Sequence, residues 1–228
     1  MGLTSLVLDW RRRLRLKRTP AGALRDYLAT PFPKPTCDYR DAELLAVDLE
    51  TTGLDPRRDQ ILSIGYVLVI GGQIDLGSAH HHTIRIDQDI PEASAIIHQI
   101  TDDQAARGEE LGAAMAAFLR ALAGRVMIAH HAHIERTFLS SACRRLYGRS
   151  LLVSVADTQT LARRSFERRD IPFKGSDLRL HALCDRYNLP RYEAHNALSD
   201  ALAAAELFLA QAAYRDGGRG LPLADFLC

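Results

Sequence analysis

The segment that most constrains this chain is an apolar run that ends in two acids, at residues 44–53. Leu44 to Val47 predict a buried strand. Residues two apart in a strand point to the same face, so Asp48 and Glu50 leave the sheet side by side. Adjacent carboxylates repel each other, and burying both without compensation is costly. A hard cation such as Mg²⁺ or Mn²⁺, which takes oxygen ligands, would resolve that conflict.

The length of this motif decides how much weight it carries. A bare Asp-x-Glu is weak, because many strands end in solvated acids. The longer string Asp48-x-Glu50-Thr51-Thr52-Gly53 is much more specific. At average composition it arises by chance in on the order of one chain in ten thousand of this length. Its hydroxyls and backbone N–H groups suit contact with a polar substrate.

Bulk properties describe an ordinary globular protein. The chain has 228 residues and a net charge of +1, so any nucleic-acid site must come from local patches. The cysteines lack CxxC spacing and indicate reduced thiols in a cytoplasmic protein, without a zinc site or disulfides. No apolar run approaches the length of a membrane span. At the N-terminus an apolar stretch precedes the arginines, which is the reverse of the order in a secretory signal.

The first 37 residues form a distinct extension. An apolar repeat predicts an amphipathic helix over residues 3–17, through Leu3, Leu6, Val7, Trp10 and Leu14. Six basic residues follow within positions 11–18, and prolines make residues 30–36 a stiff linker. The basic stretch is either an arm for phosphate or a protein partner, or a solvated face covering the main domain; membrane-surface binding is a third option. We expect a compact domain over residues 38–216 and a tail over 217–228.

Hydrophobic patterning predicts an α/β fold. The strand that starts at residue 44 and ends in the two acids forms an antiparallel meander with strands over residues 61–70 and 74–86, and Gly71-Gly72 is a hairpin turn. His80 to His82 fall on the third strand, where alternating faces favour an exposed strand over a metal site. Further strands are predicted at 125–129 and 151–156, and helices near 92–106, 110–123, 132–147, 178–187 and 197–214. Antiparallel strands followed by alternating helices and strands imply a mixed sheet flanked by helices.

Two later acids fit the first pair. Glu135 shares the apolar face of its predicted helix with Phe138, Leu139 and Ala142, whereas a surface glutamate would sit on the other face. Asp200 likewise shares the inward face of the last long helix. The alternative for Asp200 is an acid that complements the helix dipole. His195 lies just before that helix, although a lone histidine is more often structural.

Three segments of the chain resemble the exonuclease motifs of the DEDDh family. They are Asp48-x-Glu50-Thr51-Thr52-Gly53, Ala129-His130-His131-Ala132 and His195-x-Ala197-x-x-Asp200-Ala201. This DnaQ-like group of 3′–5′ exonucleases is related to the proofreading epsilon subunit of bacterial DNA polymerase III. The resemblance covers roughly residues 42–213. The second motif departs from the family, which expects Asn at position 131 and Asp at position 135.

The resemblance implies a fold, cofactors and residue roles. The fold is RNase H-like, with a mixed five-stranded sheet, and the cofactors are two Mg²⁺ or Mn²⁺ ions. Asp48 would bridge both ions, Glu50 and Asp200 would complete the first, and Glu135 would hold the second. His195 would be the general base. Nucleic acid would contact Thr51, Thr52, Leu54, His131 and His98, although a helix-end role for His98 is equally open.

These expectations describe a metal-dependent 3′–5′ exonuclease that releases nucleoside monophosphates from single-stranded ends, with DNA favoured and a role in proofreading or DNA repair. An exonuclease acting on RNA or short oligonucleotides uses the same chemistry. A catalytically weakened polymerase-associated or nucleic-acid-binding subunit is the alternative of another class, because the second motif is altered. A polymerase or other protein partner would bind through the N-terminal extension.

Overall fold

The computed structural model describes residues 3–86, 106–192 and 196–228, and the burial of side chains from residue 7 onward. Its centre is a sheet with the strand order β3-β2-β1-β4-β5. The strands are β1 (Leu44–Thr51), β2 (Ile61–Ile70), β3 (Gln73–Thr83), β4 (Val126–Ala129) and β5 (Val155–Asp157). The first three strands pair antiparallel, and β4 and β5 join in parallel. The predicted mixed five-stranded sheet is confirmed.

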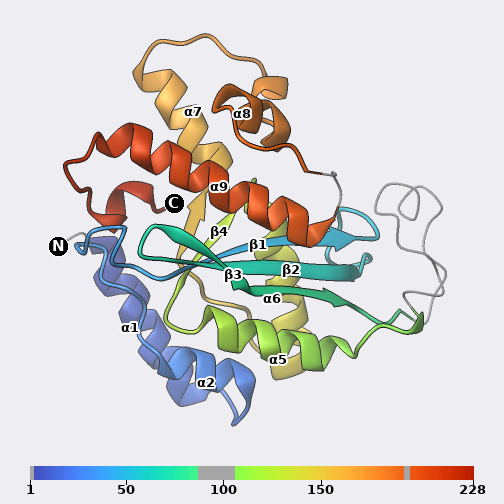
Figure 1. Cartoon of the computed structure of the whole chain (residues 1–228). Helices are drawn as coiled ribbons and strands as arrows, with labels where there is room; N and C mark the ends of the chain where they lie inside the picture. Colours follow the sequence, from blue (N-terminus) through green and yellow to red (C-terminus); the bar gives the residue numbers. More distant parts are fainter. Residues whose placement is uncertain (1–2, 87–105, 193–195) are drawn as a thin grey trace.

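Helices cover both faces of the sheet (Figure 1). One face carries α9 (Ala197–Asp216), with α7 (Thr158–Arg168), η1 (Gly175–Leu178) and α8 (Leu180–Arg186) beyond it. The other face carries α5 (Leu111–Leu122), α6 (His133–Tyr147), α1 (Leu3–Arg18) and α2 (Ala23–Ala29). A short η2 (Leu223–Phe226) follows α9. Among the described residues, no helix combines the length and apolarity that a membrane crossing requires.

Strand β1 shows how the alternation of side chains positions the acids. Leu45, Val47 and Leu49 belong to the hydrophobic cluster beneath α5 and α6. Leu44 and Ala46 belong to the cluster beneath α9. Since side chains two apart share a face, Asp48 and Glu50 continue the α9 side. The acids therefore lie where the apolar contact with α9 gives way to the end of the sheet.

The extension and the tail both pack against the domain between them. Leu24, Tyr27 and Leu28 of α2 are buried in the same cluster as the α5 side of the sheet, and the Tyr27 hydroxyl donates to the Leu152 carbonyl at 2.7 Å. At the other end, the backbone N–H of Leu223 donates to the Cys37 carbonyl at 2.8 Å, and Phe226 is buried. Residues before and after the predicted domain thus contribute to its core.

The predicted apolar face of the first helix is wrong. Val7 and Trp10 are 47% and 61% exposed, while Leu8 and Leu16 pack against the core. Between them on the inward face, the Arg12 guanidinium pairs with Asp9 and donates to the Leu28 carbonyl at 2.6 Å. That carbonyl lies at the C-terminal end of α2, where helical partners run out. A satisfied guanidinium can be buried, which the hydrophobic pattern could not indicate.

Other differences concern single elements. The α7 helix and α2 were not predicted, and the helix expected at 178–187 is divided into η1 and α8. The fifth strand pairs over residues 155–157 rather than 151–156. The helix predicted near residues 92–106 falls mainly outside the described residues.

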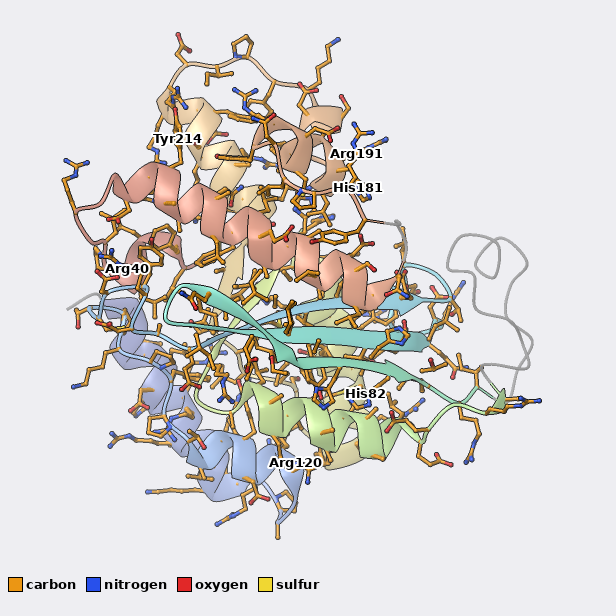
Figure 2. All side chains as sticks on the ribbon, viewed as in Figure 1. Arg40, His82, Arg120, His181, Arg191 and Tyr214 are labelled. Atoms are coloured by element: carbon orange, nitrogen blue, oxygen red, sulfur yellow. The ribbon has the colours of Figure 1, made fainter. Side chains whose placement is uncertain are left out.

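The three successive histidines of β3 form no joint site. His80 and His81 are exposed, and His82 lies on the α5 side of the sheet (Figure 2). There, His82 Nε2 lies 3.0 Å from the Tyr66 hydroxyl and Nδ1 lies 2.5 Å from Glu109 Oε1. His82 is thus half-buried, whereas its two neighbours face solvent.

Candidate metal centre

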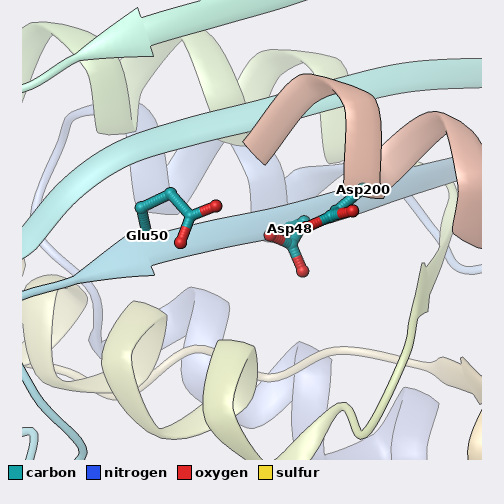
Figure 3. A group of neighbouring side chains, drawn as sticks. All are labelled: Asp48, Glu50 and Asp200. Atoms are coloured by element: carbon teal, nitrogen blue, oxygen red, sulfur yellow. The ribbon is translucent and has the colours of Figure 1, made fainter. Parts of the chain in front are cut away.

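Three carboxylates converge at the end of β1. Asp48, Glu50 and Asp200 each offer an oxygen, and these oxygens all lie within 4.8 Å of one another. Figure 3 shows the first two rising from β1 beneath the first turn of α9, which carries Asp200. Such a donor set contains only oxygen and carries a triple negative charge when ionised, which suits a hard divalent cation. The predicted convergence of these three acids is present in the structure.

The start of α9 is fixed by its cap. The Asn196 side-chain oxygen accepts hydrogen bonds from the N–H groups of Leu198 and Ser199, at 3.1 and 3.2 Å. Asparagine is a favoured N-cap because it satisfies donors that have no partner in the first turn. The cap places Asp200 in that turn. The helix register, and with it the direction of the third acid, is therefore set locally by the sequence.

A glycine lets α9 approach the sheet. Gly65 lies on β2 directly opposite Asp48. A Cβ atom there would lie 2.2 Å from the backbone carbon of Ala197 and 2.2 Å from the nitrogen of Leu198. Contacts this short cannot be relieved by a side-chain rotation, because both atoms belong to the backbone. Absence of a side chain at position 65 thus permits the close contact that brings Asp200 to β1.

Glu135 reaches the same region from α6. It is 3% exposed, and its Oε2 has no hydrogen-bond partner among the described residues. Burial, followed by the charges of Asp157 and Glu50, raises the Glu135 pKa to about 8. Glu135 stands outside the 4.8 Å group, yet its charge is the first electrostatic cause that raises the pKa of Asp48, after burial itself. The fourth predicted acid therefore lies near Asp48 and Glu50.

Asp48 and Glu135 are poor anions without a counter-charge. Burial raises the Asp48 pKa well above its usual range, and the charges of Glu135, Glu50 and Asp200 raise it further. A buried, unpaired carboxylate carries a large desolvation cost. A bound divalent cation would offset both the repulsion and that cost. The residues present therefore fit a metal site in charge, donor type and convergence.

The turn at His131, in the second motif, is hydrogen-bonded to an acid that the sequence prediction missed. Asp157, at the end of β5, accepts hydrogen bonds from the His131 N–H at 3.1 Å and the Gln159 N–H at 3.0 Å. His131 has φ 60°, a left-handed conformation that asparagine and histidine tolerate better than most residues. Histidine can thus replace the family's asparagine without straining the turn. The signal for Asp157 was its position as an N-cap, directly after a strand.

His130 links this turn to the α7 side of the fold. Its Nε2 donates to the Leu178 carbonyl at 3.0 Å, because that oxygen can only accept. Its Nδ1 lies 2.8 Å from the Thr158 hydroxyl. Burial lowers the His130 pKa to about 4. His130 is therefore neutral at physiological pH, and its contacts with Thr158 and Leu178 hold the turn in place.

Three of the predicted substrate contacts, Thr51, Thr52 and Leu54, lie at the end of β1 and in the loop that follows it, and His131 lies in the turn after β4. Thr51 is buried, and its hydroxyl donates to the Gly53 carbonyl at 2.7 Å. Thr52 is half-buried, and Leu54 is 78% exposed at the loop. His131 is also exposed. The remaining predicted residues, His195 and His98, lie outside the described residues.

Comparison with known proteins agrees with this architecture. The family model described as "Exonuclease" matches residues 45–208. The DNA polymerase III subunit epsilon of Treponema pallidum is 30% identical over 170 residues, which cover 74% of this chain and 76% of that protein. A PolC-type DNA polymerase III of Thermotoga maritima is 29% identical over 75% of this chain. The match spans only 12% of that polymerase's length.

Solved structures share the fold. Exonuclease X in complex with 5′ overhanging duplex DNA aligns with a TM-score of 0.60 and 24% identity, over 80% of this chain and 98% of that chain. The nuclease domain of 3′hExo, a DEDDh family member bound to rAMP, aligns with a TM-score of 0.65 and 15% identity, over 81% and 98%. Fold and acidic site together define an RNase H-like nuclease domain. The chain belongs to the exonuclease family, and the predicted resemblance to its DEDDh, epsilon-like members is confirmed.

Proposed function

We propose that this protein is a metal-dependent 3′–5′ exonuclease that hydrolyses phosphodiester bonds at single-stranded 3′ ends and releases nucleoside monophosphates. The observation that carries the proposal is the convergence of Asp48, Glu50 and Asp200 from two distant segments of the chain. Related proteins support it, since they include a polymerase epsilon subunit, a nuclease bound to DNA and a nuclease bound to rAMP.

The four acids would hold two Mg²⁺ or Mn²⁺ ions. Asp48, Glu50 and Asp200 would hold one ion, and Asp48 and Glu135 would hold the other. When bound, such ions stabilise the charge that develops on the attacking and leaving oxygens of a phosphoryl displacement. Glu135 is one methylene longer than the aspartate of the family, so its reach from α6 is larger. Its buried, unbonded Oε2 is the acceptor available for an ion or its water.

Proton transfer and substrate positioning fall to the remaining residues. His195, directly before the Asn196 cap of α9, would take the proton from the attacking water, because an imidazole titrates near neutral pH. The exposed Leu54 side chain offers an apolar surface to the terminal base. Thr51, Thr52, His131 and His98 would contact the terminal nucleotide through hydroxyl, imidazole and backbone groups.

DNA is the favoured substrate, because the polymerase relatives are DNA polymerase subunits. An exonuclease for RNA or short oligonucleotides would use the same acids. A weakened, polymerase-associated subunit is the alternative that the glutamate at position 135 favours. The N-terminal extension offers a protein partner the exposed apolar pair Val7 and Trp10 beside its basic residues. A cytoplasmic location fits four free cysteines and a DNA substrate.

A nuclease assay tests the proposal. A 20-nucleotide DNA strand labelled at its 5′ end should yield a ladder that shortens from the 3′ end with Mg²⁺, and no products with excess chelator. Matched RNA and duplex substrates rank the preferences. Endonucleolytic fragments, or full activity in chelator, would contradict it. Inactivity of the wild-type protein together with tight DNA binding would favour the weakened subunit.

A further inference from the structure

A cleft rich in arginine lies on the α6 side of the β1–β2 loop, outside the acidic centre. Its volume is about 290 Å³. Four arginines and a single aspartate, Asp59, line it together with an apolar floor that includes Phe138 and Ala142. The arginines come from three separate segments: Arg57 and Arg58 from the loop, Arg85 from the chain after β3, and Arg145 from α6. We call this feature the arginine cleft.

Two of the four guanidinium groups are available to a ligand. Arg85 pairs with Glu110, and Arg58 lies 3.9 Å from the Asp55 carboxylate. Arg57 and Arg145 are exposed and form no ion pair with the described residues. Guanidinium groups that converge without carboxylate partners favour a phosphate, which they can bind through two parallel hydrogen bonds.

The loop that supplies Arg57 is held in place. The Ser141 hydroxyl of α6 donates to the Pro56 carbonyl at 3.0 Å. Within the loop, the Asp59 carboxylate accepts from the Asp55 N–H at 2.8 Å, which turns the chain on itself. The first bond fixes the loop against α6, on which Arg145 also lies, and the second fixes the shape of the loop. The cleft is therefore a built feature of the fold rather than a chance grouping of flexible side chains.

The arginine cleft borders two predicted parts of the active site, Thr52 and the first turn of α6. Gln60, which lines it, exchanges two hydrogen bonds of 3.0 Å with Thr52, a predicted substrate contact. On α6, the floor residue Phe138 lies three residues after Glu135, about 4.5 Å along the helix axis. A strand whose 3′ end reaches the acids can thus place a neighbouring backbone phosphate at the cleft.

We propose that the arginine cleft binds backbone phosphates of the nucleic acid beyond its terminal nucleotide. The inference rests on the proposed function, and it assigns Arg57 and Arg145 as substrate-binding residues outside the acidic centre. Two sources offer the same phosphodiester chemistry: upstream nucleotides of the cleaved strand, and the opposite strand of a duplex. Salt-sensitive binding of long substrates is the expected consequence, because each phosphate contact releases counterions.

Equilibrium binding tests the cleft independently of catalysis. The probe is a fluorescent 20-nucleotide oligodeoxythymidine in chelator, with anisotropy measured over a range of salt concentrations. Arg57→Ala/Arg145→Ala should lower the slope of log Kd against log salt by about 1.4, since each contact to a single strand contributes about 0.7. The control Arg163→Ala/Arg219→Ala removes the same charge from exposed positions outside the cleft and should keep the wild-type slope.

Kinetics separate this inference from the proposed function. With Mg²⁺, the cleft variant should raise KM on the 20-mer by about tenfold with kcat unchanged, and should leave both constants unchanged on a dinucleotide, which is too short to reach the cleft. Failure of the wild-type protein to cleave either substrate would overturn the proposed exonuclease activity. The salt dependence of binding would still show whether the arginine cleft binds phosphates.

The source of the phosphate is found by changing the probe. A slope change with the single strand assigns the cleft to upstream phosphates. A change confined to a duplex with a 5′ overhang assigns it to the opposite strand. An unchanged slope with both probes, or an equal change in the control variant, overturns the inference. Equal melting temperatures of all variants establish that binding differences are local.

Discussion

Gly65 faces Asp48 across the antiparallel β1–β2 ladder, and the backbone of Ala197 occupies the space that a side chain at position 65 would need. The sheet residue that pairs in register with Asp48, a proposed metal ligand, is thus also the residue that admits α9. Metal site and helix packing are therefore coupled at a single position of β2.

Gly65→Ala should weaken metal binding and stability together. A Cβ atom 2.2 Å from the α9 backbone must displace the helix or the strand, and overpacking of this kind costs about 1–3 kcal/mol. Thermal unfolding with and without Mg²⁺ measures both effects. The control Gly77→Ala, on exposed β3, should change neither by a comparable amount. Wild-type Mg²⁺ affinity in Gly65→Ala would show that the approach of α9 is not critical.

Glu135→Gln should stabilise the metal-free protein while it cripples turnover. The amide removes one of four acids that repel each other, and its NH₂ group can donate to a neighbouring carboxylate. We expect a gain on the order of 1–2 kcal/mol in chelator, the scale of relieving an unpaired buried charge. Denaturant unfolding and an exonuclease assay measure the two effects. A variant that is both wild-type in activity and unchanged in stability would remove Glu135 from the site.

Glu135→Asp tests whether the glutamate at position 135 does the work of the family's aspartate or marks a partial loss of function. The shorter side chain restores the family's residue but withdraws the carboxylate by about one methylene, and displacements near 1 Å can cost 10²-fold in rate. We therefore expect lower activity or a changed preference between Mg²⁺ and Mn²⁺. Activity well above that of the native protein would instead mark the glutamate as a partial loss of function.

Much of the fold could be predicted from the sequence because the patterns that indicate it involve only neighbouring residues. The alternation in β1 and the apolar face around Glu135 required only neighbouring residues, and the strand and the helix that they predict are present. Gly65 and Asp157 escaped prediction because their importance depends on distant partners, α9 in one case and the turn at His131 in the other. The inward face of α1 escaped for the same reason: Arg12 is buried only because α2 supplies carbonyl acceptors.

His195→Ala should reduce the exonuclease rate by at least about 10²-fold, the usual contribution of a general base. Metal binding and melting temperature should remain at wild-type values, because the Asn196 cap that orients Asp200 is retained. The measurement is single-turnover cleavage of a 3′ end across pH. A near-normal rate at neutral pH would show that another group accepts the proton.

Acid should destabilise the protein partly through His130. Its folded pKa of about 4 lies below the ordinary value of 6.5, so the unfolded chain binds the proton first as pH falls. The contribution is complete above pH 6.5, and on the order of 2 kcal/mol is lost between pH 6.5 and 4. His130→Gln should be less stable at pH 8 and show a shallower loss over that range. Parallel curves for the two proteins would exclude this role.

The central claim is that acids from β1 and α9 form one metal-dependent site for 3′-end hydrolysis. Its most direct measurement is release of nucleoside 5′-monophosphate from a 20-nucleotide DNA strand, for wild type and Asp200→Asn, across a Mg²⁺ titration. We predict saturable activity for wild type, and for Asp200→Asn a loss of activity with a raised or equal melting temperature in chelator. Wild-type turnover by a folded Asp200→Asn protein, or turnover independent of Mg²⁺, would contradict the account.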